Sequence, residues 1–141
     1  MILISHRGNI TGPNKEMENK PEYIEKTLKM GYDVEVDVWC FGGGGYWLGH
    51  DKPQYYVDES FIHNKKLWCH AKNIDALNQM IDTKFIHCFW HQEDDVTLTS
   101  RGYLWTYSGK KLTKNSIAVL PDEKIKVEVA GICSDNIRDW K

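Results

Sequence analysis

Acidic residues alternate with valines in the segment Asp33-Val34-Glu35-Val36-Asp37-Val38. Successive side chains of a β-strand point to opposite faces, so this segment predicts a strand with one valine face and one carboxylate face. Carboxylates held close together repel one another unless protons or a cation compensate them, and their oxygens are ligands for magnesium, calcium or manganese. The same alternation also fits an edge strand whose acidic face lies in water. The pattern alone leaves both interpretations open.

Two histidines follow strand-like segments on either side of the acidic strand. His6 ends the short apolar run Ile2 to Ser5, and His50 follows a glycine-rich hairpin that leaves the acidic strand. Parallel α/β folds gather their sites at the carboxyl ends of strands, so we expect the two imidazoles to divide general-base and general-acid roles there. Arg7, beside His6, has a planar guanidinium that suits phosphate oxygens.

The elements that must position these residues alternate between strands and helices. Apolar residues at helical spacing between Pro21 and Met30 predict one helix, and the N-cap residue Asn73 precedes a second over Asp75 to Ile81. The predicted strands are Ile2 to Ser5, Tyr32 to Trp39, Tyr46 to Leu48, Lys66 to His70, Phe85 to Trp90, Tyr103 to Tyr107, Ser116 to Leu120 and Gly131 to Cys133. This order favours parallel pairing with right-handed crossovers, in an open doubly wound sheet or in a closed barrel.

Length and composition limit the class of protein. The chain has 141 residues, of which 41% are hydrophobic and 27% charged, and this predicts one globular domain over residues 1–141. A formal net charge of −2 gives no electrostatic case for a nucleic-acid partner. No apolar stretch is long enough for a membrane span. The absence of a signal peptide and of CxxC pairs predicts a cytoplasmic protein with four reduced, buried thiols, although one disulfide is the alternative.

The order and spacing of these motifs resemble the signature of the glycerophosphodiester phosphodiesterases, a family of TIM-barrel enzymes in the phosphatidylinositol phospholipase C-like superfamily. The matching segments are His6-Arg7-Gly8, Glu18-Asn19, Gly31 to Val38 and Gly49-His50-Asp51, followed by Trp105-Thr106 and Gly131 to Asp135. The resemblance implies an α/β fold, a reduced or incomplete TIM-type (β/α) barrel with fewer helices than usual, because eight strand–helix units need about 250 residues. An incomplete barrel would expose strand edges that a second copy of the chain could cover, as a homo-oligomer.

The resemblance also implies a reaction and the residues that carry it. The reaction is metal-assisted hydrolysis of a small-molecule phosphodiester, here a glycerophosphodiester, to a phosphomonoester and an alcohol. His6 and His50 would be the catalytic acid/base pair, while Arg7 and Lys72 would bind phosphate. The candidate pocket-lining residues are Glu18, Asn19, His91 and Trp105.

The predicted metal site departs from the family's pattern at one position. Family members carry an acidic residue two positions before the lysine of the third strand, whereas this chain has His70 before Lys72. The predicted ligands of the divalent cation are therefore Glu35, Asp37 and His70. Imidazole favours zinc, nickel or manganese over magnesium or calcium, so the cation stays open among these five.

Two other functions are compatible with the sequence. One is a non-catalytic module that binds phosphate or a sugar phosphate on a shrunken barrel, which the substitution at His70 favours and the retained histidine pair opposes. The other is a zinc site of cysteine and histidine, which the wide spacing of the cysteines disfavours. Asp135, at the end of the last predicted strand, fits either the rim of a pocket or a turn.

Overall fold

Ten strands form one mixed β-sheet in the computed structural model, which describes all of residues 1–141. The strands are β1 (Ile2–His6), β2 (Asp33–Trp39), β3 (Tyr46–Leu48), β4 (Tyr55–Val57), β5 (Leu67–Ala71), β6 (Cys88–Trp90), β7 (Val96–Leu98), β8 (Leu104–Tyr107), β9 (Ser116–Val119) and β10 (Gly131–Ser134). Seven of them pair in parallel, in the order β6-β5-β2-β1-β10-β9-β8. The other three pair antiparallel, β3 with β2, β4 with β3 and β7 with β8.

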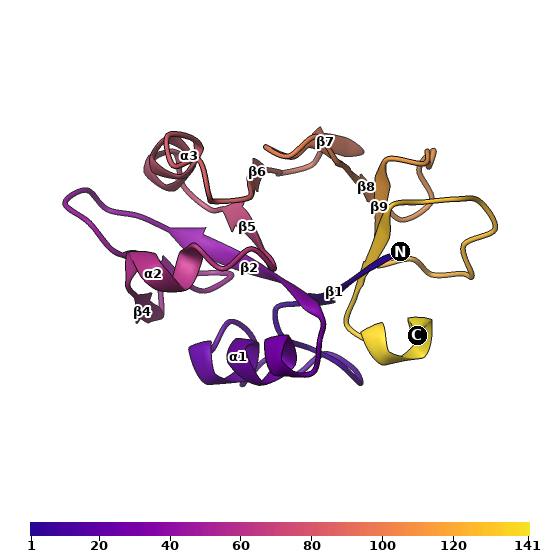
Figure 1. Cartoon of the computed structure of the whole chain (residues 1–141), viewed down its shortest axis with the longest axis horizontal. Coiled ribbons are helices and arrows are strands. Elements are labelled where there is room, and N and C mark those ends of the chain that lie inside the picture. The colour runs from indigo at the N-terminus through magenta and orange to yellow at the C-terminus, as the bar shows by residue number, and fades with distance from the viewer.

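The helices are few and short. They are α1 (Pro21–Lys29), α2 (Glu59–Ile62), α3 (Ile74–Ile81) and a C-terminal 3-10 helix, η1 (Ile137–Trp140). The start of α1 suits Pro21, because a first-turn residue needs no backbone N–H. The predicted cap of α3 is confirmed, since the Asn73 side chain accepts a hydrogen bond from the Ala76 N–H. Figure 1 shows the strands curving around the centre of the molecule, with the helices on the outside.

The expected reduced TIM-type (β/α) barrel is wrong. The sheet is mixed and is not closed, because β6 pairs only with β5, β7 pairs only with β8, and no ladder joins β6 to β7. Two of the crossovers between neighbouring parallel strands, β8 to β9 and β9 to β10, also lack a helix. The connections 108–115 and 120–130 are rich in charged residues, and Ile125, Val127 and Val129 alternate as in an extended segment, so both connections cross between parallel strands as loops.

The predicted elements agree best where the side-chain pattern is strong. The acidic strand and its hairpin partner are confirmed as β2 and β3. The predicted strand Phe85 to Trp90 is shorter than expected and begins at Cys88, because Phe85 is 61% exposed and Ile86 belongs to a turn closed by its bond to the Thr83 carbonyl. Four elements, β4, α2, β7 and η1, were not predicted from the sequence, because each is too short to produce a clear periodicity.

The two faces of the sheet carry different cores. Val34 and Val36 of β2 lie on the outer face, in a core of 16 buried residues that also receives residues of α1 and α3. The inner core lies on the opposite face and contains Trp68, Phe89 and Trp105. Because side chains alternate along β2, its carboxylates share the inner face with these rings.

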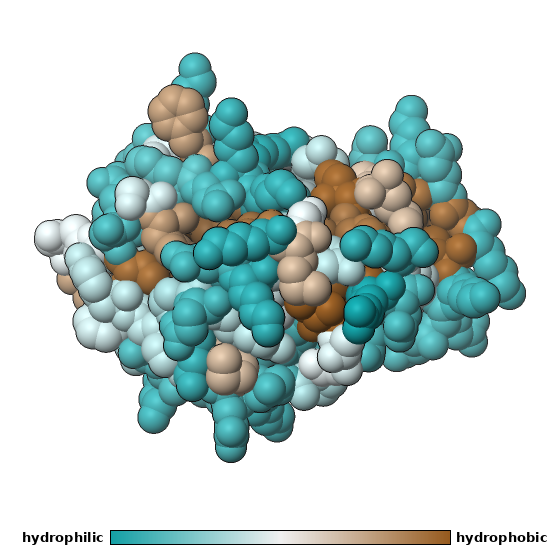
Figure 2. All heavy atoms as spheres, turned by 60° about the horizontal axis from the view of Figure 1, so that its bottom comes forward, coloured by the Kyte–Doolittle hydropathy of each residue, from teal (hydrophilic) through white to brown (hydrophobic).

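With the apolar side chains packed in these cores, the surface is mostly hydrophilic and the cysteine thiols are buried. Seen from the side of α1, hydrophilic residues cover most of the molecule, and hydrophobic residues show mainly in hollows between them (Figure 2). Each helix falls short of the length and apolar character that crossing a membrane requires. The prediction of four buried, free cysteines is confirmed.

His87 gives the fold a dependence on pH. Its ring packs on Trp68 with centroids 4.1 Å apart, and its Nε2 lies 2.8 Å from Thr99 Oγ1. Burial lowers the pKa of His87 to about 3, and the charge of Arg101 acts in the same direction. The unfolded chain binds a proton at this residue below about pH 6.5, which the folded chain does not. The stability that neutral His87 contributes is therefore present above about pH 6.5 and decreases as the pH falls below it.

We predict that His87→Phe makes the fold less sensitive to acid, because phenylalanine keeps a ring against Trp68 and cannot titrate. Between about pH 7 and about pH 5.5, the free energy of unfolding of the wild type should fall by about 1 kcal/mol more than that of the variant. Urea denaturation at the two pH values measures both quantities. An equal decrease in the two proteins would contradict a neutral, buried imidazole.

Candidate functional site

Strand register brings the predicted site residues together at one end of the inner face. His6 of β1 pairs with Glu35 of β2, and Asp37 of β2 pairs with His70 of β5. Directly opposite residues of neighbouring strands place their side chains on the same face. The four side chains therefore lie beside the inner core, where the His70 ring stacks on Phe89 with centroids 5.2 Å apart.

Glu35, Asp37 and His70 could hold a metal ion, since one ligand atom of each lies within 4.8 Å of the others and all three residues are buried. Glu35 Oε2 and Asp37 Oδ1 have no hydrogen-bond partner. His70 Nε2 lies 3.0 Å from the His91 carbonyl and so carries the donated hydrogen. Its Nδ1 then faces the carboxylates, 3.3 Å from Asp37 and 3.7 Å from Glu35. This arrangement needs either a proton on Nδ1 or a cation between the three side chains.

The charges around Asp37 determine its protonation. Burial opposes a charge on this carboxylate, but the His70 imidazole and the Arg7 guanidinium outweigh burial and hold the pKa of Asp37 well below its usual range. Burial likewise opposes a charge on His70, but Asp37 and Glu35 raise the pKa of His70 to about 9. Lys72 adds a further cation, with its Nζ 3.9 Å from Asp37 Oδ1. Without a bound metal ion, His70 is therefore protonated at neutral pH.

Arg7 spans the site and contacts three of its members. Its Nε lies 3.0 Å from Asp37 Oδ2, its Nη1 donates to Glu18 at 3.3 Å and its Nη2 donates to His50 Nδ1 at 2.7 Å. A guanidinium only donates, so His50 Nδ1 accepts and the neutral ring carries its proton on Nε2. The 3.5 Å approach of the same Nδ1 to Asp37 is consequently not a hydrogen bond.

His50 lies at the site, but the strand that it follows is not of the expected kind. It does not follow a parallel strand but comes just after β3, which runs antiparallel to β2. The Gly49 N–H donates to the Asp37 carbonyl at 3.1 Å and holds the next residue beside the carboxylates. A Cβ at Gly49 would lie 2.0 Å from the Lys52 carbonyl oxygen, so this tight turn requires glycine.

The backbone is strained at two residues of the site. Arg7 has φ 56° and Asn19 has φ 63°, both in the left-handed region. This conformation costs a residue such as Arg7 on the order of 1 kcal/mol or more and persists only where the surroundings impose it, whereas asparagine tolerates it better. Here the Arg7 N–H donates to the Glu35 carbonyl and the Arg7 carbonyl accepts from the Asn19 N–H. The strain thus accompanies the placement of the guanidinium over Asp37.

The four candidate pocket-lining residues take different positions. Asn19 is fully buried and supports Asp37: its amide donates to Asp37 Oδ2 at 2.9 Å and accepts from the Asp37 N–H at 3.0 Å. Glu18 accepts hydrogen bonds from Arg7 and Asn9. The His91 ring stacks on Tyr107 next to His70. Trp105 is 2% exposed and belongs to the inner core.

Asp135 and Asn9 are site residues that the sequence analysis left undecided or missed. His6 Nδ1 lies 2.8 Å from Asp135 Oδ1, while His6 Nε2 lies 3.8 Å from Glu35 Oε2. Burial opposes a charge on His6, but the bond to Asp135 helps to outweigh it and the pKa of His6 is raised. The Asn9 amide donates to Asp135 at 2.7 Å and to Glu18 at 2.9 Å. A predicted pairing of the last strand with the first, as β10 pairs with β1, would have placed Asp135 beside His6. For Asn9, the sequence offers no clue beyond its closeness to His6 in the chain.

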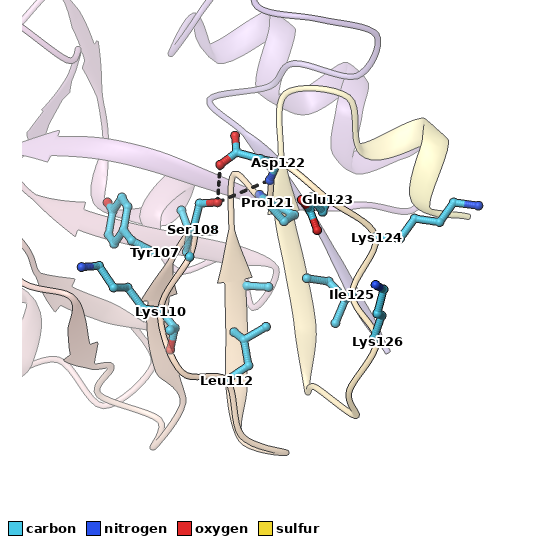
Figure 3. A pocket seen from close by; sticks show the side chains of 14 residues that line it. Tyr107, Ser108, Lys110, Leu112, Pro121, Asp122, Glu123, Lys124, Ile125 and Lys126 are labelled. Atoms are coloured by element: carbon cyan, nitrogen blue, oxygen red, sulfur yellow. Dashed lines mark hydrogen bonds between the residues drawn. The ribbon is translucent and has the colours of Figure 1, made fainter.

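A separate hollow of about 470 Å³ lies beside β8 and β9, between the loops that follow these strands (Figure 3). Ser108 donates to Asp122 at 2.6 Å across one side of it. None of the predicted catalytic, phosphate-binding or metal-binding residues lines this hollow. The candidate chemistry therefore belongs to the cluster around Asp37 and not to this hollow.

Comparisons of the chain with protein-family models, with curated proteins and with solved structures give no match. The resemblance to the glycerophosphodiester phosphodiesterases therefore stays a prediction from the motif residues.

We predict that Asn19→Asp destabilises the fold by about 2 kcal/mol or more, because it replaces the amide that donates to buried Asp37 by a second carboxylate of the same shape. Asp37→Asn in the same chain provides the missing donor and should recover part of this loss. The free energies of unfolding of the two single variants and the double variant measure the coupling. Losses that simply add would contradict a direct contact between the two side chains.

Proposed function

We propose that the protein catalyses metal-assisted hydrolysis of a phosphodiester, specifically a glycerophosphodiester, to a phosphomonoester and an alcohol. The observation that carries this proposal is the convergence of two histidines and a guanidinium on a buried Glu35–Asp37–His70 cluster with unpartnered carboxylate oxygens. A site that only bound phosphate would need the cations but would not need an imidazole on either side.

Arg7 and Lys72 provide the charge that binds the phosphate. The Arg7 side chain is 17% exposed, that of Lys72 is 19% exposed and that of His50 is 44% exposed, so all three are partly accessible to a ligand from solvent. In the free protein, Arg7 Nη2 donates to His50 Nδ1. A phosphate oxygen that accepts this hydrogen bond instead leaves the Nδ1 lone pair of His50 free to take a proton.

The two histidines then differ in role. His50 takes a proton from the attacking water as the water oxygen forms its bond to phosphorus. His6, oriented through Nδ1 by Asp135, donates from Nε2 to the alcohol oxygen as its bond to phosphorus breaks. The carboxylate of Asp135 stabilises the charged form of His6, which suits it to be the proton donor.

Glu35, Asp37 and His70 would hold the divalent cation. A cation there supplies Lewis-acid stabilisation of the negative charge that builds on the phosphate oxygens. Two carboxylate oxygens and one imidazole nitrogen form a mixed ligand set, which suits manganese, zinc or nickel better than an all-oxygen site would.

We predict that manganese or zinc raises the melting temperature of the wild type, because a ligand that binds only the folded state stabilises it by about 2.7 kcal/mol at a concentration 100 times its dissociation constant. Glu35→Gln keeps the side-chain shape and removes a ligand charge, so the shift should largely disappear. Glu123→Gln is the matched control on an exposed loop and should behave as the wild type. A shift that is absent in the wild type, or retained in Glu35→Gln, would contradict the metal site.

We predict that the manganese-loaded protein hydrolyses bis(nitrophenyl) phosphate and glycerophosphocholine. His6→Ala and His50→Ala should each lower kcat/KM by about 100-fold or more, because each removes one proton-transfer group. Asp135→Asn should have a smaller effect of about ten-fold, since the imidazole stays in place. His63→Ala is the control, because His63 lies outside the site and contacts Glu59. Phosphate binding without any turnover would overturn catalysis in favour of a binding module.

A further inference from the structure

The carboxylate face of β2 continues beyond the site as a row of aromatic rings. Trp39 follows Asp37 by two residues and lies on the same face. Trp39 pairs with Trp47 of β3, and Trp47 pairs with Tyr56 of β4, so the three rings share that face. Phe41, just after β2, stacks on Trp39 with centroids 6.3 Å apart and an interplanar angle of 12°. We call Trp39, Phe41, Trp47 and Tyr56 the aromatic shelf.

The rings of the aromatic shelf are not part of the hydrophobic core on the outer face of the sheet. Phe41 is 56% exposed, Trp47 38% and Tyr56 58%, whereas Tyr46 and Leu48 alternate with Trp47 and are fully buried in the outer core. The hairpin of β3 and β4 is therefore anchored by the face that carries Tyr46 and Leu48, which is opposite to the shelf. Trp47 and Tyr56 contact each other edge to face, with centroids 5.6 Å apart. Exposed aromatic rings gathered in this way mark a binding surface rather than a core.

The shelf is joined to the candidate active site. Trp39 Nε1 donates to the Gly49 carbonyl at 2.7 Å, and Gly49 immediately precedes His50. Two steps along a strand cover about 7 Å, so the Trp39 ring begins about that far from Asp37. A group esterified to a phosphate held by Arg7 and His50 needs only a short linker to reach this ring.

We propose that the aromatic shelf binds a flat aromatic ring in the alcohol part of the phosphodiester, an inference that rests on the proposed function. The near-parallel rings of Trp39 and Phe41 present faces on which a planar group can stack. A quaternary ammonium group is instead bound by rings that enclose it, and these four follow one face of a sheet. The net charge of −2 disfavours a long nucleic acid as the ligand, so the ring belongs to a small molecule.

Two esters of glycerol phosphate that differ by one ring test this. With the phenylethyl ester, Trp47→Ala should raise KM by about ten-fold, because one stacking contact is lost, and should leave kcat nearly unchanged. With the ethyl ester, the same variant should behave as the wild type. Phe41→Ala should act like Trp47→Ala, whereas Phe85→Ala, an equally exposed aromatic residue outside the shelf, should change neither ester. A larger effect of Trp47→Ala on glycerophosphocholine than on the phenylethyl ester would overturn the inference.

Binding without turnover separates this inference from the proposed function. Calorimetry with phenylethyl phosphate and ethyl phosphate should show that the ring tightens binding to the wild type about ten-fold, and that Trp47→Ala removes this advantage. Equal affinities of the wild type for the two compounds would overturn the shelf while leaving the phosphate site in place. If neither compound bound, the phosphate site and the proposed function would themselves be contradicted.

Discussion

The carboxylate of Asp37 is completely buried, and the structure around it depends on the compensation of its charge. Arg7 lies 3.0 Å from one oxygen, the Asn19 amide donates to the same oxygen, and His70 faces the other. These partners come from the segment after β1 and from β5, so the charge holds those elements to β2. Removing a partner from a buried charge costs several kcal/mol, because the charge is left uncompensated. The same contacts that keep Asp37 ionised also align the candidate catalytic groups.

The site needs only part of the sheet. Four neighbouring parallel strands, in the order β5-β2-β1-β10, place His70, Asp37, His6 and Asp135 at one end of the inner face. Their register does not require that the remaining strands close into a barrel. A motif similarity carried by these strands is therefore compatible with an open, ten-stranded sheet in which β6 and β7 stay unpaired with each other. The geometry of the candidate site and the closure of the fold are therefore separate properties of this chain.

The sequence predicted the parts of the structure that rest on local periodicity. The alternation in β2 fixed which side chains share a face, and the helical spacing and caps located α1 and α3. Long-range properties were not available from such patterns. The approach of Asp135 to His6 depends on the pairing of β10 with β1 across 129 positions, and the openness of the sheet depends on which strands fail to pair. The support that Asn19 gives Asp37 likewise depends on contacts between distant segments, which its place in the Glu18-Asn19 motif does not reveal.

Our central proposal is that Glu35, Asp37 and His70 bind a divalent cation next to a phosphate held by Arg7. A crystal structure of the protein with manganese and inorganic phosphate, with anomalous diffraction recorded at the manganese edge, tests it most directly. We expect one anomalous peak coordinated by Glu35, Asp37 and His70. We also expect the phosphate oxygens to accept hydrogen bonds from Arg7, and His50 to be released from its hydrogen bond with Arg7. A peak elsewhere, or a phosphate that leaves the Arg7–His50 bond intact, would contradict it.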